Sequence, residues 1–187
     1  MRPRAVYAMG GAGSGKSTWM GQLLKELRAD LGPEETLHSQ HLYSPHHKRE
    51  YLVELRGHRW PGGAYLGVMR DSFPGADGLV RTSGPVARDW LVNGDVPDMV
   101  VGEGLLLSSR PFLQALHAAT DLLVVHLAVP EPVRLARIRA RGHEFNEQWS
   151  RQTVSRAANT ARDLAAAGVR VELNSSPALA ALWLEDL

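Results

Sequence analysis

The chain has 187 residues, of which 44% are hydrophobic and 22% charged, and its net charge is +1. This composition is typical of a globular domain that buries its own core, and it excludes a disordered chain. No apolar run approaches the roughly 18 residues that a membrane-spanning helix requires, so no membrane partner is expected. Because there is no cysteine, disulfides, thiolate metal sites and cysteine nucleophiles are excluded, which is consistent with a cytoplasmic protein.

The first part of the chain predicts a strand and then a helix. The apolar run at 6–9 is predicted as a buried strand, and the helical pattern begins after the stretch GGAGSGKST. From 33 to 63 the pattern is weaker and favours only a strand near 36–43. Two histidine pairs at 38–41 and 46–47 lie in this segment, but they lack a third ligand at a set spacing, so no metal site is predicted.

The rest of the chain alternates helical patterns with short apolar runs. This alternation is typical of βαβ units and predicts a parallel sheet. Pro85 falls in the first turn of a predicted helix, and Gly94 follows its end. The further predicted elements are a strand at 98–102, a helix at 111–119, a strand at 122–129, helices at 132–141 and 146–167, a strand at 169–173, and a last helix from 176 that carries Leu179, Leu182 and Trp183.

The stretch GGAGSGKST contains the phosphate-binding pattern G-x-x-x-x-G-K-[ST], which Gly10, Gly15, Lys16 and Ser17 satisfy between a strand and a helix. Backbone N–H groups of such a loop surround a phosphate, and the helix N-terminus adds a partial positive charge. Lys16 is predicted to contact the β- and γ-phosphates, and the Ser17 hydroxyl to bind Mg²⁺. The predicted nucleotide-binding residues of the loop are Gly11, Ala12, Gly13, Ser14, Gly15, Lys16, Ser17 and Thr18.

Glu103 ends the strand at 98–102 in the sequence VVGEG. A carboxylate there lies at the carboxyl edge of the expected sheet, where it can hold a Mg²⁺-bound water, so Glu103 is predicted as a catalytic and metal-binding residue. A turn or helix-cap role for Glu103 is the alternative. Asp98 is the rival acid, but it begins the strand and belongs at the opposite edge.

The P-loop, an acid that ends a central strand, and a late arginine-rich helical pair together resemble the nucleoside and nucleotide kinase superfamily. VVGEG is also similar to a segment of uridine-kinase-like enzymes. The resemblance implies a three-layer α/β fold with a five-stranded parallel sheet flanked by helices, and the use of ATP and Mg²⁺. We expect a single domain over 1–187, with an acceptor-binding insertion at about 33–83 and a helical lid at about 132–156.

The segment RLARIRARGHEF supplies the lid. Arg137 and Arg141 are four residues apart on one helix face, and Arg134 lies on the same stripe. Arginine forks suit the spread charge of a transferring phosphoryl group, so Arg137 and Arg141 are predicted to bind nucleotide and to act in catalysis. The segment also resembles the lid of gluconate-kinase-like enzymes, apart from an inserted Glu144, which leaves a small-metabolite kinase as an alternative. Arg151 and Arg156, on the second lid helix, are further candidates.

AYLGVMRDSFPGADGL, VVGEG, RARG and NEQW occur in an order that resembles phage-type P-loop kinases, some of which phosphorylate 5-hydroxymethyluracil in DNA. The resemblance implies a transferase that moves the γ-phosphate of ATP to a hydroxyl of a nucleoside- or nucleotide-type acceptor. Its most specific form is DNA modification at a 5-hydroxymethyl pyrimidine of phage DNA, in the host cytoplasm. A nucleotide-regulated ATP-binding protein without kinase activity is the remaining alternative.

Two groups of residues complete the predicted site. Asp71, Asp77 and Glu103 are the candidates for the base that accepts the hydroxyl proton, although Asp77-Gly78 also fits a simple turn. In the kinase superfamily, the turn that contains Asn174 and Ser175 borders the adenine, and these two residues are predicted to bind the nucleotide. The same turn also fits a helix cap that needs no ligand.

Overall fold

The computed structural model describes residues 2–69, 74–140 and 146–185. Its strands and helices run in chain order as β1 (Arg4–Met9), α1 (Lys16–Glu26), β2 (Glu35–Ser44), β3 (Arg49–Trp60), β4 (Gly63–Leu66), η1 (Ala76–Gly78), α2 (Ser83–Asn93), β5 (Met99–Glu103), α3 (Arg110–Ala119), β6 (Asp121–His126), α4 (Glu131–Ala140), α5 (Glu147–Ala166), β7 (Arg170–Leu173) and α6 (Pro177–Glu185). The fold is therefore mixed α/β, as the sequence predicts.

The seven strands of the described residues belong to one sheet, in the order β2-β3-β4-β5-β1-β6-β7. The part from β4 to β7 is parallel, whereas β3 pairs antiparallel with both β2 and β4. The prediction of a five-stranded sheet is therefore wrong in size. The strand predicted near 36–43 is present as β2, whereas β3 and β4 were not predicted. Many residues in the outer half of β3 are exposed, so no long apolar run marks that strand in the sequence.

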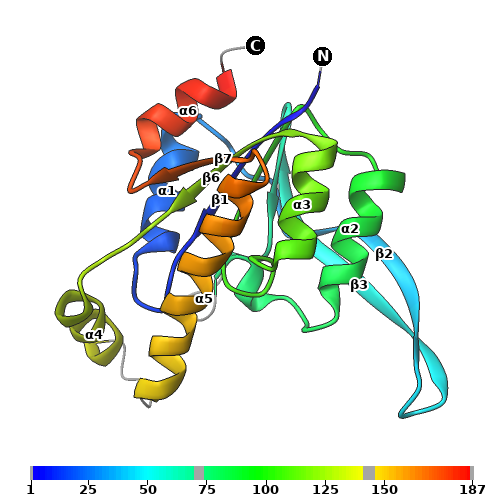
Figure 1. Ribbon diagram of the computed structural model, residues 1–187. Coiled ribbons are helices and arrows are strands. Elements are labelled where there is room, and N and C mark those ends of the chain that lie inside the picture. Colours follow the sequence, from blue (N-terminus) through cyan, green and yellow to red (C-terminus); the bar gives the residue numbers. More distant parts are fainter. Residues whose placement is uncertain (1, 70–73, 141–145, 186–187) are drawn as a thin grey trace.

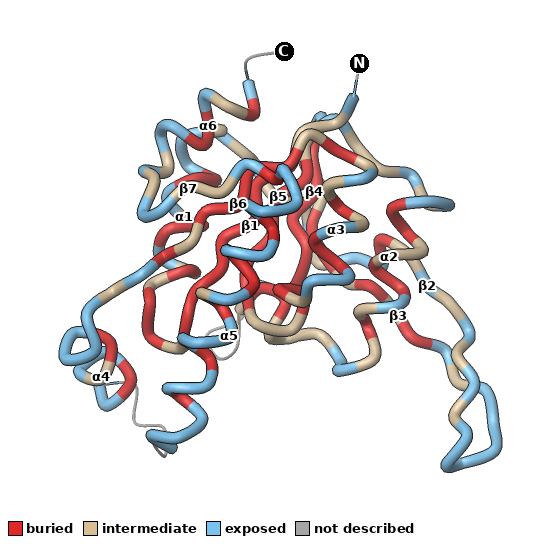
Figure 2. Tube along the Cα trace, viewed as in Figure 1, coloured by how far each residue is buried: buried red, intermediate tan, exposed pale blue. Residues whose placement is uncertain are grey.

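Helices cover both faces of the parallel part of the sheet (Figure 1). Helices α2, α3 and α5 pack on one face, where Tyr7, Trp90 and Phe112 are fully buried. On the other face α1 packs against α6, around Met20 and Leu23. The central strands are almost entirely buried (Figure 2). This three-layer arrangement leaves only the edges of the sheet open for a site.

The β2–β3 hairpin extends well beyond the helical layers (Figures 1 and 2). In its outer half Leu42 lies opposite Tyr51, and Tyr43 lies opposite Glu50. Tyr43 is 60% exposed and Leu52 54% exposed, so this part of the hairpin has little core of its own. The predicted acceptor-binding insertion thus includes a projecting two-stranded arm.

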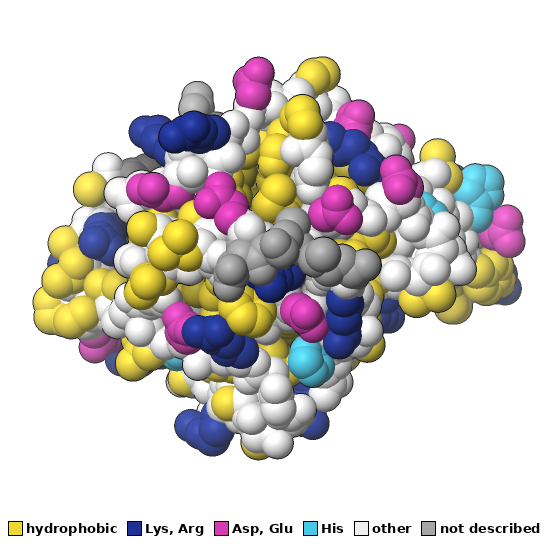
Figure 3. Space-filling model, turned by 90° about the horizontal axis from the view of Figure 1, so that it is seen from above, with side chains coloured by type: hydrophobic (Ala, Val, Ile, Leu, Met, Phe, Trp, Pro, Cys, Tyr) yellow, Lys and Arg dark blue, Asp and Glu magenta, His cyan; other side chains and the backbone are white. Residues whose placement is uncertain are grey.

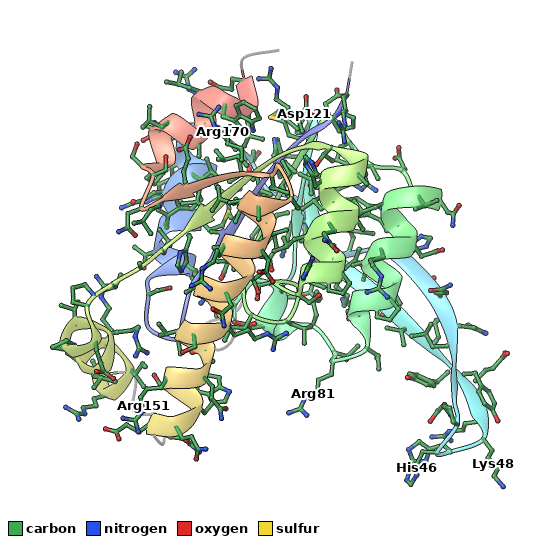
Figure 4. All side chains as sticks on the ribbon, viewed as in Figure 1. His46, Lys48, Arg81, Asp121, Arg151 and Arg170 are labelled. Carbon is green, nitrogen blue, oxygen red and sulfur yellow. The ribbon has the colours of Figure 1, made fainter. Side chains whose placement is uncertain are left out.

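The edge at which the parallel strands end lies on the lower side of the views in Figures 1 and 4. Asp121, which begins β6, is labelled on the upper side, and β1 runs parallel to β6, so both strands end below. Lys16 begins α1 after the loop that follows β1, and Glu103 ends β5 beside it. Within the described part of the chain, no helix is both long and apolar enough to cross a membrane.

Candidate active site

The P-loop between β1 and α1 has a backbone that only glycine adopts easily. Gly13 has φ of 76° and Gly15 has φ of 91°, both in the left-handed region. A Cβ at Gly13 would lie 2.6 Å from the carbonyl oxygen of Arg134, and a Cβ at Gly15 would lie 3.2 Å from Nη1 of Arg137. The glycines therefore allow the loop to turn while the helix α4 lies directly against it.

Lys16 and Ser17 lie where the motif predicts, in the first turn of α1. The Lys16 side chain is buried, and its Nζ donates to the carbonyl oxygens of Gly10 at 3.3 Å and Gly11 at 3.4 Å. The Ser17 hydroxyl donates to Oε1 of Glu103 at 2.9 Å. An ammonium and a hydroxyl from the start of α1 and a carboxylate from the end of β5 thus lie at the mouth of the P-loop.

Glu103 is only 1% exposed and lies beside Ala8 in the pairing of β5 with β1. The helix-cap alternative does not apply, because α3 begins at Arg110 and its N-cap is Ser109. Gly75 packs so closely that a Cβ there would lie 2.5 Å from Oε1 of Glu103. The fold therefore holds this carboxylate firmly beside Ser17.

Asp77 holds the loop that follows Glu103. Its Oδ1 accepts from the backbone N–H groups of Leu105 at 2.6 Å and Leu106 at 3.1 Å. Beneath this loop, the Tyr7 hydroxyl donates to the carbonyl oxygen of Gly104 at 3.0 Å. Burial, with the negative charges of Glu103 and Asp77 nearby, raises the pKa of Tyr7, so the hydroxyl stays protonated and can donate. These contacts favour an anchoring role for Asp77.

Of the described lid arginines, Arg134 and Arg137 contact the P-loop, although Arg137 also faces solvent. Nη1 of Arg137 lies 3.4 Å from the carbonyl oxygen of Ser14, and Arg134 contacts Ala12. Arg151 pairs with Glu147 on its own helix at 3.3 Å, and Arg156 is exposed. Two further predicted residues, Asp71 and Arg141, lie outside the described residues.

A hollow of about 510 Å³ lies beside the P-loop, on the side of α1 and the β6–α4 connection. Its lining combines apolar side chains with polar groups of the loop: Ser14, Gly15, Thr18, Trp19, Gln22, Leu127, Val129, Arg137 and Ala140. A second hollow, of about 540 Å³, lies between β7 and α6 at Leu182 and Trp183, away from the P-loop residues. The first hollow is therefore the one that adjoins the P-loop.

Asn174 and Ser175 do not line this hollow but support its walls. The Asn174 side chain accepts from the backbone N–H of Ala128 at 2.9 Å and donates to the Ala128 carbonyl oxygen at 3.1 Å. The carbonyl oxygen of Ser175 accepts from Nε1 of Trp19 at 2.8 Å. The predicted adenine neighbours thus fix Trp19 and the β6–α4 connection, which border the hollow.

The chain matches the family described as P-loop Nucleotide Kinase3 over residues 1–177. It belongs to this P-loop nucleotide kinase family. Membership indicates a nucleotide-binding protein with kinase-type phosphotransferase activity, and it implies ATP, typically used with Mg²⁺. Among curated proteins, none matches the chain.

The residues of this kinase-family site fit the Mg²⁺ ion that the family implies. Ser17 and Glu103 supply two oxygen atoms at the phosphate-binding loop, and Mg²⁺ in such sites takes few protein ligands because it keeps waters and phosphate oxygens. Bound Mg²⁺ would neutralise phosphate charge during transfer. Among the described residues no group of three or more His, Asp or Glu side chains is placed to hold a metal ion.

Sequence reasoning missed several residues of this kinase site. Trp19 and Gln22 follow the P-loop by a few positions on α1, and that proximity is a usable signal for the walls of the hollow. Leu127 and Val129 belong to the end of the predicted strand at 122–129, which the structure ends at His126. Thr153 on α5 contacts the P-loop from 141 residues away in the sequence, and no local pattern marks it.

Proposed function

We propose that this kinase-family protein transfers the γ-phosphate of ATP, with Mg²⁺, to a hydroxyl group of a nucleoside- or nucleotide-type acceptor. The observation that carries the proposal is the contact of Ser17 with Glu103 beside Lys16, at the mouth of a loop with an open hollow of about 510 Å³ beside it. A buried carboxylate beside the P-loop hydroxyl suits a site that holds Mg²⁺ against the phosphates, which phosphoryl transfer requires.

In the proposed reaction, the acceptor oxygen attacks the γ-phosphorus while the bond to the β–γ bridging oxygen breaks and ADP leaves. Lys16 stabilises the negative charge of the transferring group, and Ser17 with Glu103 holds the metal. Arg137 and Arg141 are proposed to approach the phosphates from the lid. The acceptor proton passes to a carboxylate, and Asp71 is the favoured base because Asp77 Oδ1 already accepts two backbone N–H groups.

We further propose a 5-hydroxymethyl pyrimidine in phage DNA as the acceptor. The support is the character of the side on which the strands end. Figure 4 shows His46 and Lys48 at the tip of the β2–β3 hairpin, and Arg81 and Arg151 on the same side of the molecule. A projecting two-stranded ribbon with a basic tip suits a duplex, because such a ribbon fits the major groove and cations bind phosphates.

The test uses ATP labelled at the γ-phosphate with a panel of acceptors: nucleosides, nucleotides, sugar acids, and duplex DNA with or without 5-hydroxymethyluracil. Label on the hydroxymethylated DNA alone is the expected result. Label on free nucleosides or nucleotides would keep the kinase and overturn the DNA acceptor. Label on a sugar acid would favour the small-metabolite alternative, and no transfer to any acceptor would overturn the proposed function.

A further inference from the structure

Ala12, in the middle of the P-loop, is held through both of its backbone polar groups by the helices α4 and α5. Its N–H donates to Oγ1 of Thr153 at 3.1 Å, and its carbonyl oxygen accepts from Nη1 of Arg134 at 3.0 Å. In a phosphate-binding loop the direction of each backbone N–H decides what anion the loop can receive. These two contacts therefore fix the part of the backbone that shapes the phosphate site.

The side chains that hold Ala12 form one buried network. Nη1 of Arg134 also donates to Oγ of Ser150 at 2.5 Å, and Oγ1 of Thr153 donates to the Ser150 carbonyl oxygen at 2.8 Å. Arg134, Ser150 and Thr153 are 3%, 1% and 7% exposed. Since each hydroxyl is engaged by a neighbour in the network, α4 and α5 contact the loop as one unit.

Close packing reinforces these hydrogen bonds. A Cβ at Gly11 would lie 2.5 Å from Cγ2 of Val154, so α5 leaves no space above the loop at this point. On the other side, a Cβ at Gly13 would lie 2.9 Å from Cγ1 of Ile138 in α4. The loop is enclosed on both sides of Ala12 and has little freedom to change shape without moving the two helices.

The network also places a positive charge behind the loop. Among the described residues no carboxylate pairs with Arg134, which donates instead to the neutral oxygens of Ala12 and Ser150. A buried guanidinium without a counter-ion is costly, and the cost falls when an anion binds nearby. The exposed Arg139 on the same helix has no such environment.

We propose that Arg134 is a positioning residue of the donor site, which acts with Ser150 and Thr153 to hold the P-loop in its phosphate-binding shape and to add buried positive charge behind it. This proposal rests on the proposed function only in taking ATP as the donor. It separates Arg134 from Arg137 and Arg141, which are expected to face the nucleotide itself. It also makes the beginning of α5 part of the ATP site.

The first experiment compares Arg134→Met, Arg134→Lys and the control Arg139→Met by calorimetric titration with ATP and with tripolyphosphate, which reports on the phosphates alone. Loss of the buried hydrogen bonds is expected to raise the Kd of both probes about 10- to 100-fold in Arg134→Met. Arg134→Lys keeps the positive charge but not the planar guanidinium donors, so its Kd should lie between those of the wild type and Arg134→Met. Arg139→Met should bind as the wild type does.

A second pair separates positioning from general stability. Thr153→Val removes the hydroxyl that accepts from Ala12 and keeps the side-chain shape, whereas Thr153→Ser restores the hydroxyl. Thr153→Val is expected to weaken tripolyphosphate binding up to about 10-fold, whereas Thr153→Ser should bind tripolyphosphate as the wild type does. Val86→Ala, which removes methyl groups from the buried face of α2, should lower the Tm without changing the Kd.

Unchanged tripolyphosphate affinity in Arg134→Met, or equal affinities in Thr153→Val and Thr153→Ser, would overturn the inference while the proposed function stands. If Arg134→Met does not fold, the Thr153 pair decides the question. A wild-type protein that binds neither ATP nor tripolyphosphate would overturn the proposed function and this inference together.

Discussion

The donor side and the acceptor side of this kinase-family protein differ in how far the fold engages their polar groups. On the donor side Lys16, Glu103 and Arg134 are 7%, 1% and 3% exposed, and each is held by neighbouring groups. On the acceptor side the hairpin tip and Arg81 are exposed, and Figure 3 shows histidines at the right-hand end, where the hairpin projects, on a surface of mixed charges. The donor-site residues are thus held in place by packing, whereas the groups proposed to meet the acceptor lie exposed on the surface.

The largest effect should come from Lys16→Ala, which removes the predicted phosphate-binding side chain from the buried donor site. Phosphoryl transfer should fall by about 10²- to 10³-fold, because a fixed charge near the transferring group stabilises mainly the transition state. The measurement is the initial rate of label transfer from ATP. The control is Lys25→Ala, which changes an exposed lysine of the same helix and should retain the wild-type rate. If Lys16→Ala transferred phosphate at the wild-type rate, Lys16 would have no role in the donor site.

Glu103→Gln tests the carboxylate at the same site. The amide keeps the shape of the side chain but removes the charge that holds Mg²⁺, so kcat is expected to fall about 100-fold and half-maximal activity to require more Mg²⁺. Asp98→Asn, an exposed acid at the opposite end of this part of the sheet, is the control and should leave the Mg²⁺ titration unchanged. An unaltered titration in Glu103→Gln would remove Glu103 from the metal site.

Substitutions of Asp77 test whether this residue anchors the loop after Glu103 or acts as the catalytic base. Asp77→Ala should lower the free energy of unfolding by about 1–3 kcal/mol, because it leaves two backbone N–H groups without their acceptor. Asp77→Asn retains an oxygen acceptor, so its stability and rate should approach those of the wild type. A folded Asp77→Asn variant that has lost phosphoryl transfer would instead make Asp77 the base. Denaturant titration and the rate assay distinguish these results.

The smallest effects are expected on the acceptor side. Lys48→Ala combined with Arg49→Ala should weaken DNA binding modestly and lower the slope of log affinity against log salt by about one to two. Affinity for ATP should not change, since the hairpin tip is separate from the P-loop (Figure 4). Arg162→Ala, an exposed arginine of α5, is the control for general charge loss. Equal salt slopes for all three proteins would remove the hairpin tip from the DNA surface.

The same difference explains what the sequence could predict. The positions of the P-loop and of Glu103 were predictable because each lies in a short stretch directly after a buried strand. The contacts of Thr153 and Arg134 with Ala12 were not, since they join segments more than a hundred residues apart. Of the two hairpin strands, β2 was predicted near 36–43, and β3 was missed because many residues of its outer half are exposed, so no long apolar run marks it.

The buried face of helix α6 could not be predicted from the sequence for a different reason. Its leucines at 179 and 182 suggest an apolar face, yet these side chains are 59% and 61% exposed. The buried residues are Ala180, Ala181 and Leu184, which pack in the cluster with α1. Small side chains allow two helices to approach closely, so hydrophobicity alone did not reveal the buried face.

The most direct test of the account is a crystal structure of the protein with Mg²⁺ and a non-hydrolysable ATP analogue. We expect the base in the hollow beside Trp19, the γ-phosphate at Lys16, the metal near Ser17 and Glu103, and the Ala12 contacts to Arg134 and Thr153 unchanged. An analogue bound elsewhere, or a P-loop that releases Arg134 to accept the phosphates, would contradict the claim that packing presets the donor site.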